Sequence, residues 1–400
     1  MRCYIELKNK GYLMEKIVTN NALNIEKVGK YSPAKRDSNL ELFRIITMIL
    51  IIAHHYVVNS GLTSEILYKY PLSGGSVFLF LFGAWGKIGI NCFILITGYF
   101  MCKTNITMKK FVKLLAEVIF YSIVIYLIFV FTGVQEFSII ETVKVLIPTT
   151  TVATNFTGTF LLFYLCIPFL NILINNLTEK QHIYLLLTSS LIYILFGTVP
   201  FFSVTMNYVS WYIVLYFISS YIRLYPKKIF NSKKLWGTLS CVSILLSVIS
   251  VIACLWLGDK INRNIAYAFV TDSNTFLAVT TGISTFLYFK NIKIKYNKLI
   301  NICGASTFGV LQIHANSDTM RQWLWRDILD NVGMYSSAWM PVHAIGSIIG
   351  IFIICTIIDY MRIKLIETPL LEVLDNKFEK LSTWYKEKEV KICEKLNISQ

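Results

Sequence analysis

The sequence predicts an all-α integral membrane protein with about ten transmembrane helices packed in one bundle. Of its 400 residues, 55% are hydrophobic and only 15% are charged, and the mean hydropathy is +0.58. A water-soluble domain of this size carries far fewer apolar residues. One transmembrane helix needs about 20 mostly apolar residues, so this chain can supply roughly ten helices and has few residues left for a soluble domain. The composition excludes a soluble enzyme held by a single anchor.

The distribution of basic residues also indicates a membrane protein. Lys and Arg number 38 against 23 Asp and Glu, a net charge of +15. On one solvated face such an excess would suggest nucleic-acid binding. Here the charges separate apolar runs, as the loops of a polytopic membrane protein do. We expect the lipid bilayer, and no nucleic acid, as a partner.

The apolar runs define the expected helices, because an open chain in lipid must satisfy its backbone polar groups within helices. In chain order, the expected spans are residues 40–58, 87–102, 112–132, 156–175, 183–200, 207–222, 235–257, 264–289, 299–316 and 337–361. Residues 76–87 are apolar too, but they contain Gly83, Gly86 and Lys87 and follow Pro71. We expect a re-entrant or interfacial segment there.

The positive-inside rule gives the expected orientation. With the amino terminus inside, 31 of the 38 Lys and Arg fall on the inner side, and 7, among them Lys87 and Arg321, fall outside. We therefore expect both termini in the cytoplasm of a multi-pass protein. Residues 1–39 are polar, with no apolar stretch before a small-residue cleavage site, which indicates a cytoplasmic extension without a signal peptide. Residues 40–369 form the expected transmembrane domain, and residues 370–400 an amphipathic helix on the inner leaflet.

The nine cysteines give no sign of a metal site or a disulfide framework. They are scattered singly, with no Cys-x-x-Cys pair and no Cys/His cluster at metal spacing. We expect no bound metal and no bound cofactor.

The first span carries the ionisable groups that most strongly suggest chemistry, because charged and titratable residues within a membrane helix are costly. Arg44 and His55 are eleven positions apart, which at 100° per residue brings them within about 20° of one helix face. They are separated by ~16 Å along the axis, so Arg44 would lie at the cytoplasmic boundary if His55 is near mid-bilayer. Glu41 lies close to the same face, and His54 points about 80° away.

An imidazole at this depth can act as a general base toward a hydroxyl, or as a transient acyl acceptor. A cation three turns below it suits the phosphates of a cytoplasmic donor with a flexible arm. Two structural alternatives stay open: Arg44 can be a topology anchor, and His54 and His55 can be bundle histidines that hydrogen-bond another helix.

Several segments resemble the motifs of one family. Arg44 and His55 fit an R-x10-H pattern with Glu41 before it. Residues 88–100 carry Gly89, Asn91, Phe93, Gly98 and Tyr99, with Asn91 where an Asp is common. Lys110 and Lys113 stand where a basic R-x-x-R element has arginines. The other matching segments are FLLFYLCIPFLN (residues 160–171), ASTFGVLQIH ending at His314, and RIKLIETPL with Arg362, Glu367 and Pro369. In this order, from residue 37 to residue 369, they resemble the membrane acyltransferase-3 family, whose members O-acylate bacterial surface glycans.

The resemblance implies a membrane O-acyltransferase in the bacterial inner membrane. It would move an acyl group, with acetyl as the default, from cytoplasmic acetyl-CoA as donor substrate to a hydroxyl of an envelope or exported polysaccharide or a lipid-linked glycan. His55 and Glu41 would be catalytic, Glu41 by fixing Arg44. Arg44, Lys110 and Lys113 would bind the CoA phosphates. His54, Asn91, Tyr99 and His314 would support the site or face the acceptor; Asn91 and Tyr99 could orient His55 or pack against a neighbouring helix.

Two other functions fit the composition. A transporter or flippase for a lipid-linked glycan would also have many spans and a few buried polar groups. It predicts charges in both halves and often repeat symmetry, whereas here the ionisable cluster lies on the first three spans. A binding or assembly subunit of a polysaccharide-export complex is the third possibility. The oligomeric state is left open by the sequence.

Overall fold

The computed structural model describes residues 37–104, 106–147, 156–199, 207–270, 272–371 and 388. Over these ranges the regular elements are helices and there is no strand, which confirms the all-α prediction. The helices of the bundle all belong to the unit of residues 38–400. The predicted amino-terminal extension and the amphipathic tail lie almost wholly outside the described residues.

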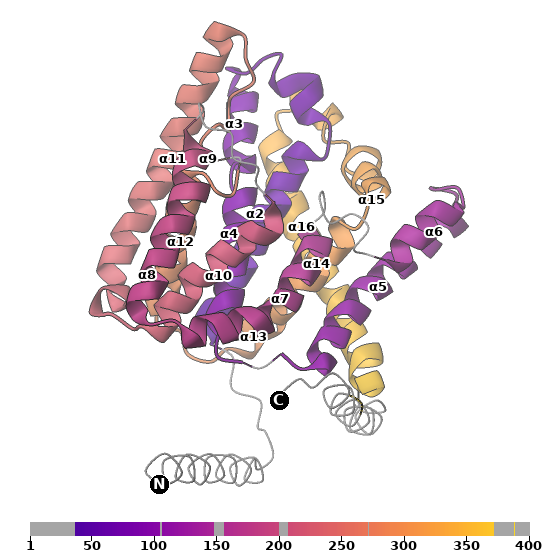
Figure 1. Cartoon of the computed structure of the whole chain (residues 1–400). Helices are drawn as coiled ribbons and strands as arrows, with labels where there is room; N and C mark the ends of the chain where they lie inside the picture. Colours follow the sequence, from indigo (N-terminus) through magenta and orange to yellow (C-terminus); the bar gives the residue numbers. More distant parts are fainter. Residues whose placement is uncertain are drawn as a thin grey trace, which may run out of the picture. The chain divides into compact units, whose positions relative to one another are not determined.

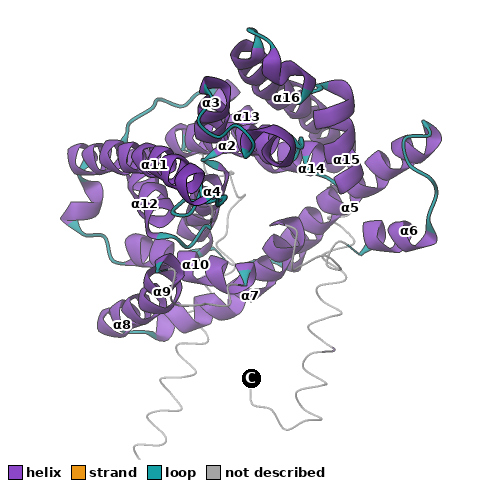
Figure 2. Ribbon diagram, turned by 90° about the horizontal axis from the view of Figure 1, so that it is seen from above, coloured by secondary structure: helices purple, strands orange, loops and turns teal. Residues whose placement is uncertain are grey.

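The described helices pack into a bundle (Figures 1 and 2). The longer ones are α2 (Ser38–Val58), α3 (Gly74–Gly83), α4 (Gly86–Met101), α5 (Met108–Phe131), α6 (Ile139–Leu146), α7 (Phe156–Asn176), α8 (Glu179–Ser190), α10 (Tyr208–Leu224), α11 (Lys233–Ile261), α12 (Phe276–Asn291), α13 (Lys298–Ala305), α14 (Thr307–His314) and α16 (Met340–Arg362). The short helix α15 (Asp318–Gln322) lies between α14 and α16.

Seven helical stretches are long and apolar enough to cross a membrane: Ser38–Val58, Gly74–Met101, Met108–Phe131, Phe156–Asn176, Glu179–Thr198, Lys233–Ile261 and Met340–Leu371. The predicted count of about ten is not confirmed. Helix α10 has 17 residues and α12 has 16. The predicted span 299–316 is two eight-residue helices, α13 and α14, that meet at Ser306.

Residues 76–87, where the sequence predicts a re-entrant or interfacial segment, belong to a longer helical stretch. Helix α3 and helix α4 are separated by only two residues, and together they form the membrane-length stretch Gly74–Met101. The glycines serve close packing: a Cβ on Gly83 would lie 2.9 Å from Val57, and a Cβ on Gly86 would overlap His54. These small residues let the stretch lie directly against α2.

The predicted span 264–289 begins too early. Helix α11 ends at Ile261 and is capped by Asn262, whose φ of 54° is left-handed, a conformation that Asn tolerates better than most residues. Residues 266–270 form turns, and α12 starts only at Phe276. The Thr275 hydroxyl donates hydrogen bonds to the carbonyls of Phe269 and Asp272 and so closes this loop.

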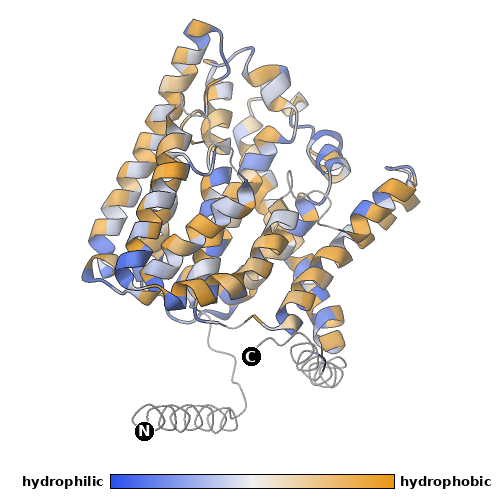
Figure 3. Ribbon diagram, viewed as in Figure 1, coloured by the Kyte–Doolittle hydropathy of each residue, from blue (hydrophilic) through white to orange (hydrophobic). Residues whose placement is uncertain are grey.

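Helix α2 lies at the centre of the bundle contacts. It contacts α3, α4, α12, α13, α14 and α16. One hydrophobic cluster joins α4, α7, α10 and α12, and a second joins the later part of α2 to α3, α14 and α16. The outward faces of α11 and α16 stay apolar, with residues such as Leu245, Ile249, Ile353 and Ile357 exposed (Figure 3), as lipid-facing helices require.

Candidate functional site

Two histidines that are 259 residues apart in the chain meet in the bundle. His55 is near the end of α2, and His314 is the last residue of α14. Nδ1 of His55 lies 3.0 Å from Nε2 of His314, and the ring centroids are 5.2 Å apart. His314 is fully buried, whereas His55 is partly exposed. The two form a histidine pair of which only His55 reaches accessible space.

The hydrogen bonds of this pair determine where its protons lie. Nδ1 of His314 is 2.7 Å from the Val310 carbonyl oxygen, which can only accept, so Nδ1 carries a proton and donates it. The Nε2 of a neutral His314 then accepts from Nδ1–H of His55. By the same reasoning Nε2 of His55 has a free lone pair. The pair therefore presents one basic nitrogen, and it is on His55.

His55 lines a cavity of about 220 Å³, called here the histidine cavity. Helices α2, α4, α7, α14 and α15 contribute to its wall. Its lining residues are Ile51, His54, His55, Val58, Asn59, Gly86, Lys87, Ile90, Phe156, Thr157, Leu311, Ala315 and Arg321. The cavity is large enough for a small reacting group next to the imidazole.

His54 lines the same cavity, and its ring is fixed by the backbone. Its Nδ1 donates to the Gly83 carbonyl at 2.6 Å, and Gly86 leaves room for the ring. The His54 and His55 rings lie 6.0 Å apart. His54 therefore borders the reacting space without joining the pair with His314.

The histidine cavity also contains two cations that the sequence patterns do not single out as site residues. Lys87, from the start of α4, donates to the Tyr208 hydroxyl at 2.7 Å. Arg321 of α15 pairs with Asp318 at 2.7 Å. From the sequence both were loop charges on the non-cytoplasmic side. Their convergence depends on the packing of α4 and α15 around α2, for which the sequence carries no local signal.

Glu41 and Arg44 form the predicted ion pair, with 3.1 Å between Oε1 and Nη1. Glu41 is 4% exposed, and the Arg44 guanidinium lies 6.0 Å from the centroid of the Phe100 ring. Helix α2 is unbroken from residue 38 to 58, so the eleven-residue spacing to His55 holds along one helix. Arg44 is not among the residues that line the histidine cavity.

Lys110 and Lys113 lie in the first turns of α5. Lys110 is exposed, and its backbone N–H donates to the Thr107 hydroxyl that caps the helix. Lys113 pairs with Glu367 at 2.7 Å. This contact brings together two of the segments on which the family resemblance rests.

Asn91 and Tyr99 both contact the neighbouring helix α10, which is one of the two alternatives that the sequence leaves open. The Asn91 amide donates to the Ser273 carbonyl at 2.6 Å, and its oxygen accepts from the Trp211 indole at 3.0 Å. The Tyr99 hydroxyl accepts from Arg223 at 2.8 Å. The side chain that hydrogen-bonds and orients His55 is His314.

A buried charge network joins α5 to the end of α16. Arg362 pairs with Asp359 at 3.0 Å, with Glu117 at 3.2 Å and with Glu367 at 2.7 Å. The Tyr121 hydroxyl donates to Asp359 at 2.8 Å. The sequence motif contained Arg362 and Glu367, but it did not contain Asp359, Glu117 or Tyr121. Asp359 could have been found from its position three residues before an Arg at the end of a span, because residues at this spacing are neighbours on a helix. Among the described residues, no group of three or more His, Cys, Asp or Glu is placed to hold a metal ion.

Comparison with known families gives one match. A family model described as an acyltransferase domain, that of the acyltransferase-3 family, matches residues 37–360, most of the chain. No curated protein and no solved structure matches the chain. The matched range contains every helix of the histidine cavity and ends just before Arg362.

Proposed function

The chain belongs to the membrane acyltransferase-3 family, and on that premise we propose that it transfers an acetyl group from acetyl-CoA to a hydroxyl of an envelope or exported polysaccharide. The observation that carries this proposal is the His55–His314 pair at the wall of a cavity. A hydroxyl is a poor nucleophile until a base takes its proton, and a neutral imidazole with a free nitrogen is the usual base.

In the proposed reaction, Nε2 of His55 removes the proton of the acceptor hydroxyl as its oxygen attacks the thioester carbon. The new C–O bond forms, and the carbonyl oxygen takes the negative charge. Collapse of this intermediate breaks the C–S bond, and the departing sulfur takes the proton from His55. Throughout, Nδ1–H of His55 donates to His314, which keeps the ring oriented and stabilises its protonated form.

Two cations are positioned to assist this step. Lys87 and Arg321 line the same cavity as His55. Positive groups that are already oriented stabilise an oxyanion in a site with little water, and one such donor is typically worth a factor of about 10²–10³ in rate. We assign this role to Lys87 and Arg321 jointly.

The donor is proposed to enter from the cytoplasmic end of α2. Arg44 would hold a CoA phosphate there, positioned by Glu41, which it contacts at 3.1 Å, and Lys110 and Lys113 would add positive charge. The pantetheine arm of CoA is long and flexible enough to reach the ~16 Å from Arg44 to His55 along α2. This donor route is part of the proposal that the protein lies in the inner membrane of a bacterium with both termini in the cytoplasm, an orientation that the excess of Lys and Arg in the predicted inner loops supports.

The direct test is acyl transfer by the purified protein in lipid nanodiscs. We expect radiolabel from acetyl-CoA to appear in a polysaccharide or lipid-linked glycan fraction of the source membrane, and free CoA to be released in equal amount. A transporter would instead move a lipid-linked glycan across proteoliposomes without consuming acetyl-CoA, and that result would replace the proposal.

The donor site makes a separate prediction. Replacing Arg44 with Ala is expected to raise the KM for acetyl-CoA by about 10- to 150-fold, since a charge-assisted phosphate contact contributes about 1.5–3 kcal/mol. The kcat should change by less than about threefold, because Arg44 is far from the thioester carbon. Arg44→Lys should be intermediate, as it keeps the charge and loses the paired donors.

Arg326→Ala is the matched control for this measurement. Arg326 also pairs with a carboxylate, Glu65, at 2.7 Å, but it lies near the opposite end of α2. It should leave the KM for acetyl-CoA unchanged. An unchanged KM in Arg44→Ala would make Arg44 a topology anchor only.

A further inference from the structure

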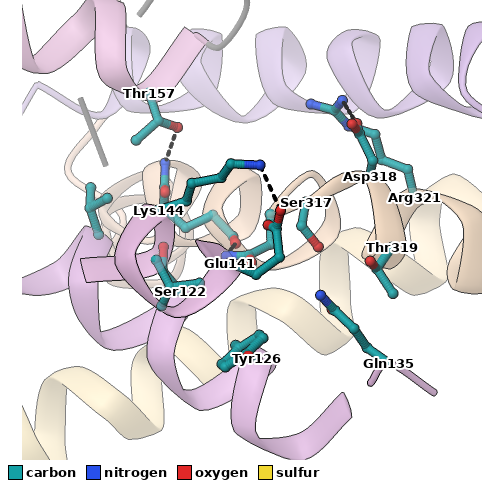
Figure 4. A pocket seen from close by; sticks show the side chains of 14 residues that line it. Ser122, Tyr126, Gln135, Glu141, Lys144, Thr157, Ser317, Asp318, Thr319 and Arg321 are labelled. Carbon is teal, nitrogen blue, oxygen red and sulfur yellow. Dashed lines mark hydrogen bonds and ion pairs between the residues drawn. The ribbon is translucent and has the colours of Figure 1, made fainter. Parts of the chain in front are cut away.

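A second, larger cavity adjoins the histidine cavity and has no role in the proposed transfer step. It measures about 530 Å³ and is called here the polar cavity. It lies between α5 and α6 on one side and the α14–α15 segment on the other (Figure 4). Thr157 and Arg321 line both cavities. A ligand in the polar cavity that contacts Thr157 or Arg321 is therefore next to the cavity that His55 lines.

The walls of the polar cavity are held in place by specific contacts. The Tyr126 hydroxyl of α5 donates to the Ser138 carbonyl and accepts from the Ser138 N–H, both at 3.1 Å, which fixes the start of α6. The buried Gln312 donates to the Thr157 hydroxyl at 2.9 Å and ties α14 to α7. The space is thus bounded by elements that are connected to one another.

The side chains around the polar cavity suit an uncharged ligand with many hydroxyls. Hydroxyl and amide groups line it, among them Ser122, Gln135 and Thr319 (Figure 4), and sugar hydroxyls both donate to and accept from such groups. Its charges are balanced within the wall: Lys144 pairs with Glu141 at 2.6 Å, and Arg321 with Asp318 at 2.7 Å. An anionic ligand would meet no excess of positive charge.

Arg321 has a buried donor for which the structure shows no acceptor. Its Nη1 binds Asp318, but its Nε is buried and has no hydrogen-bond partner. Burial of an unpaired donor is costly, and this donor lies on a side chain common to both cavities. A hydroxyl or ring oxygen of a bound ligand is the group that could accept from it.

We propose that the polar cavity binds an uncharged sugar unit of the acceptor and that Arg321, at the boundary between the two cavities, directs the acceptor hydroxyl toward His55. This inference rests on the proposed acyl transfer and adds to it the place and chemical class of the acceptor. The apolar cavity of about 390 Å³ between α5 and α16 offers hydroxyl groups almost no partners and does not compete for this role.

The test fills the polar cavity without touching His55. Ser122→Trp places an indole in it from α5, and Leu127→Trp is the matched control, because Leu127 is on the same helix and 43% exposed. The probes are methyl glycosides of glucose, galactose, mannose and N-acetylglucosamine, with methyl glucuronide and glucose 6-phosphate as charged counterparts. We expect Ser122→Trp to raise the acceptor KM at least about tenfold, equivalent to ~1.4 kcal/mol, with the acetyl-CoA KM unchanged. Leu127→Trp should behave as the unmodified protein.

Binding measured without acetyl-CoA separates this inference from the proposed function. Saturation-transfer NMR on nanodiscs should show at least one neutral glycoside bound by the unmodified protein and by Leu127→Trp, and lost in Ser122→Trp. That pattern without any acetyl transfer would support the cavity and reject the acyltransferase proposal. Equal binding in Ser122→Trp, no binding of any neutral glycoside, or preference for the charged sugars would overturn the cavity assignment.

Discussion

Replacing His55 with Ala is expected to lower the kcat for acyl transfer by about 10²–10⁴-fold, the usual contribution of a general base. The reason is the arrangement of protons in the pair: with Nδ1 donating to His314, Nε2 of His55 is the nitrogen with a free lone pair at the histidine cavity. The KM for acetyl-CoA should stay within about threefold, since the imidazole acts on the acceptor proton and does not bind the CoA phosphates.

His54→Ala is the matched control for this loss. His54 is the adjacent residue and lines the same cavity, but its ring is held by the Gly83 carbonyl and it does not contact His314. We expect its kcat to fall by less than about tenfold, because only packing near the site is lost. Equal activity in His55→Ala and the unmodified protein would remove His55 from the chemistry. A larger loss in His54→Ala than in His55→Ala would move the base to His54.

The role of the pair is tested by His314→Gln, with kcat measured across a range of pH. The amide oxygen of the substituted side chain could still accept from Nδ1–H of His55 and keep the ring oriented, whereas His314→Ala leaves that N–H without its partner. We expect His314→Gln to retain more activity than His314→Ala at every pH. Equal loss in both would mean that His314 does more than orient His55.

The fold could be predicted from the sequence where hydropathy alone decides it. The span expected at residues 40–58 is α2, Ser38–Val58, and the span at 337–361 is α16, Met340–Arg362. Hydropathy was not sufficient where the role of a residue depends on the helix packed against it. Gly83 and Gly86 looked like a break for an interfacial segment, but they are the contact points of α3 and α4 with α2. A glycine in an apolar run indicates a turn or a close approach equally well.

The sequence could predict only those site contacts that join residues close together on one helix. Glu41 and Arg44 are three residues apart on one helix, so their ion pair follows from helix geometry. His55 and His314 were both candidates, but their contact depends on where α14 packs against α2, 259 residues away. Lys87 and Arg321 were hidden among loop charges for the same reason. A single chain carries no signal for such pairs until the helices are placed.

The largest effect on stability is expected from Arg362, which holds three carboxylates at the junction of α5 and α16. Its side chain is 6% exposed and contacts Asp359, Glu117 and Glu367. Removing one partner of a buried ion pair leaves a charge without compensation, and this costs about 3–5 kcal/mol. We therefore expect Arg362→Ala to lower the free energy of unfolding by about that amount, measured by denaturant titration of the purified protein.

Lys113→Ala removes a second cation that contacts this network and is the control. Lys113 pairs with Glu367 at 2.7 Å, but its side chain is 46% exposed, and exposed pairs contribute about 0–1 kcal/mol. Its unfolding free energy should hardly change. If the network is what Arg362 supports, then Glu117→Gln should recover part of the loss in an Arg362→Ala background, because one uncompensated carboxylate is gone. Equal stability of Arg362→Ala and Lys113→Ala would show that water already reaches the three carboxylates, and that the α5–α16 junction does not depend on their neutralisation.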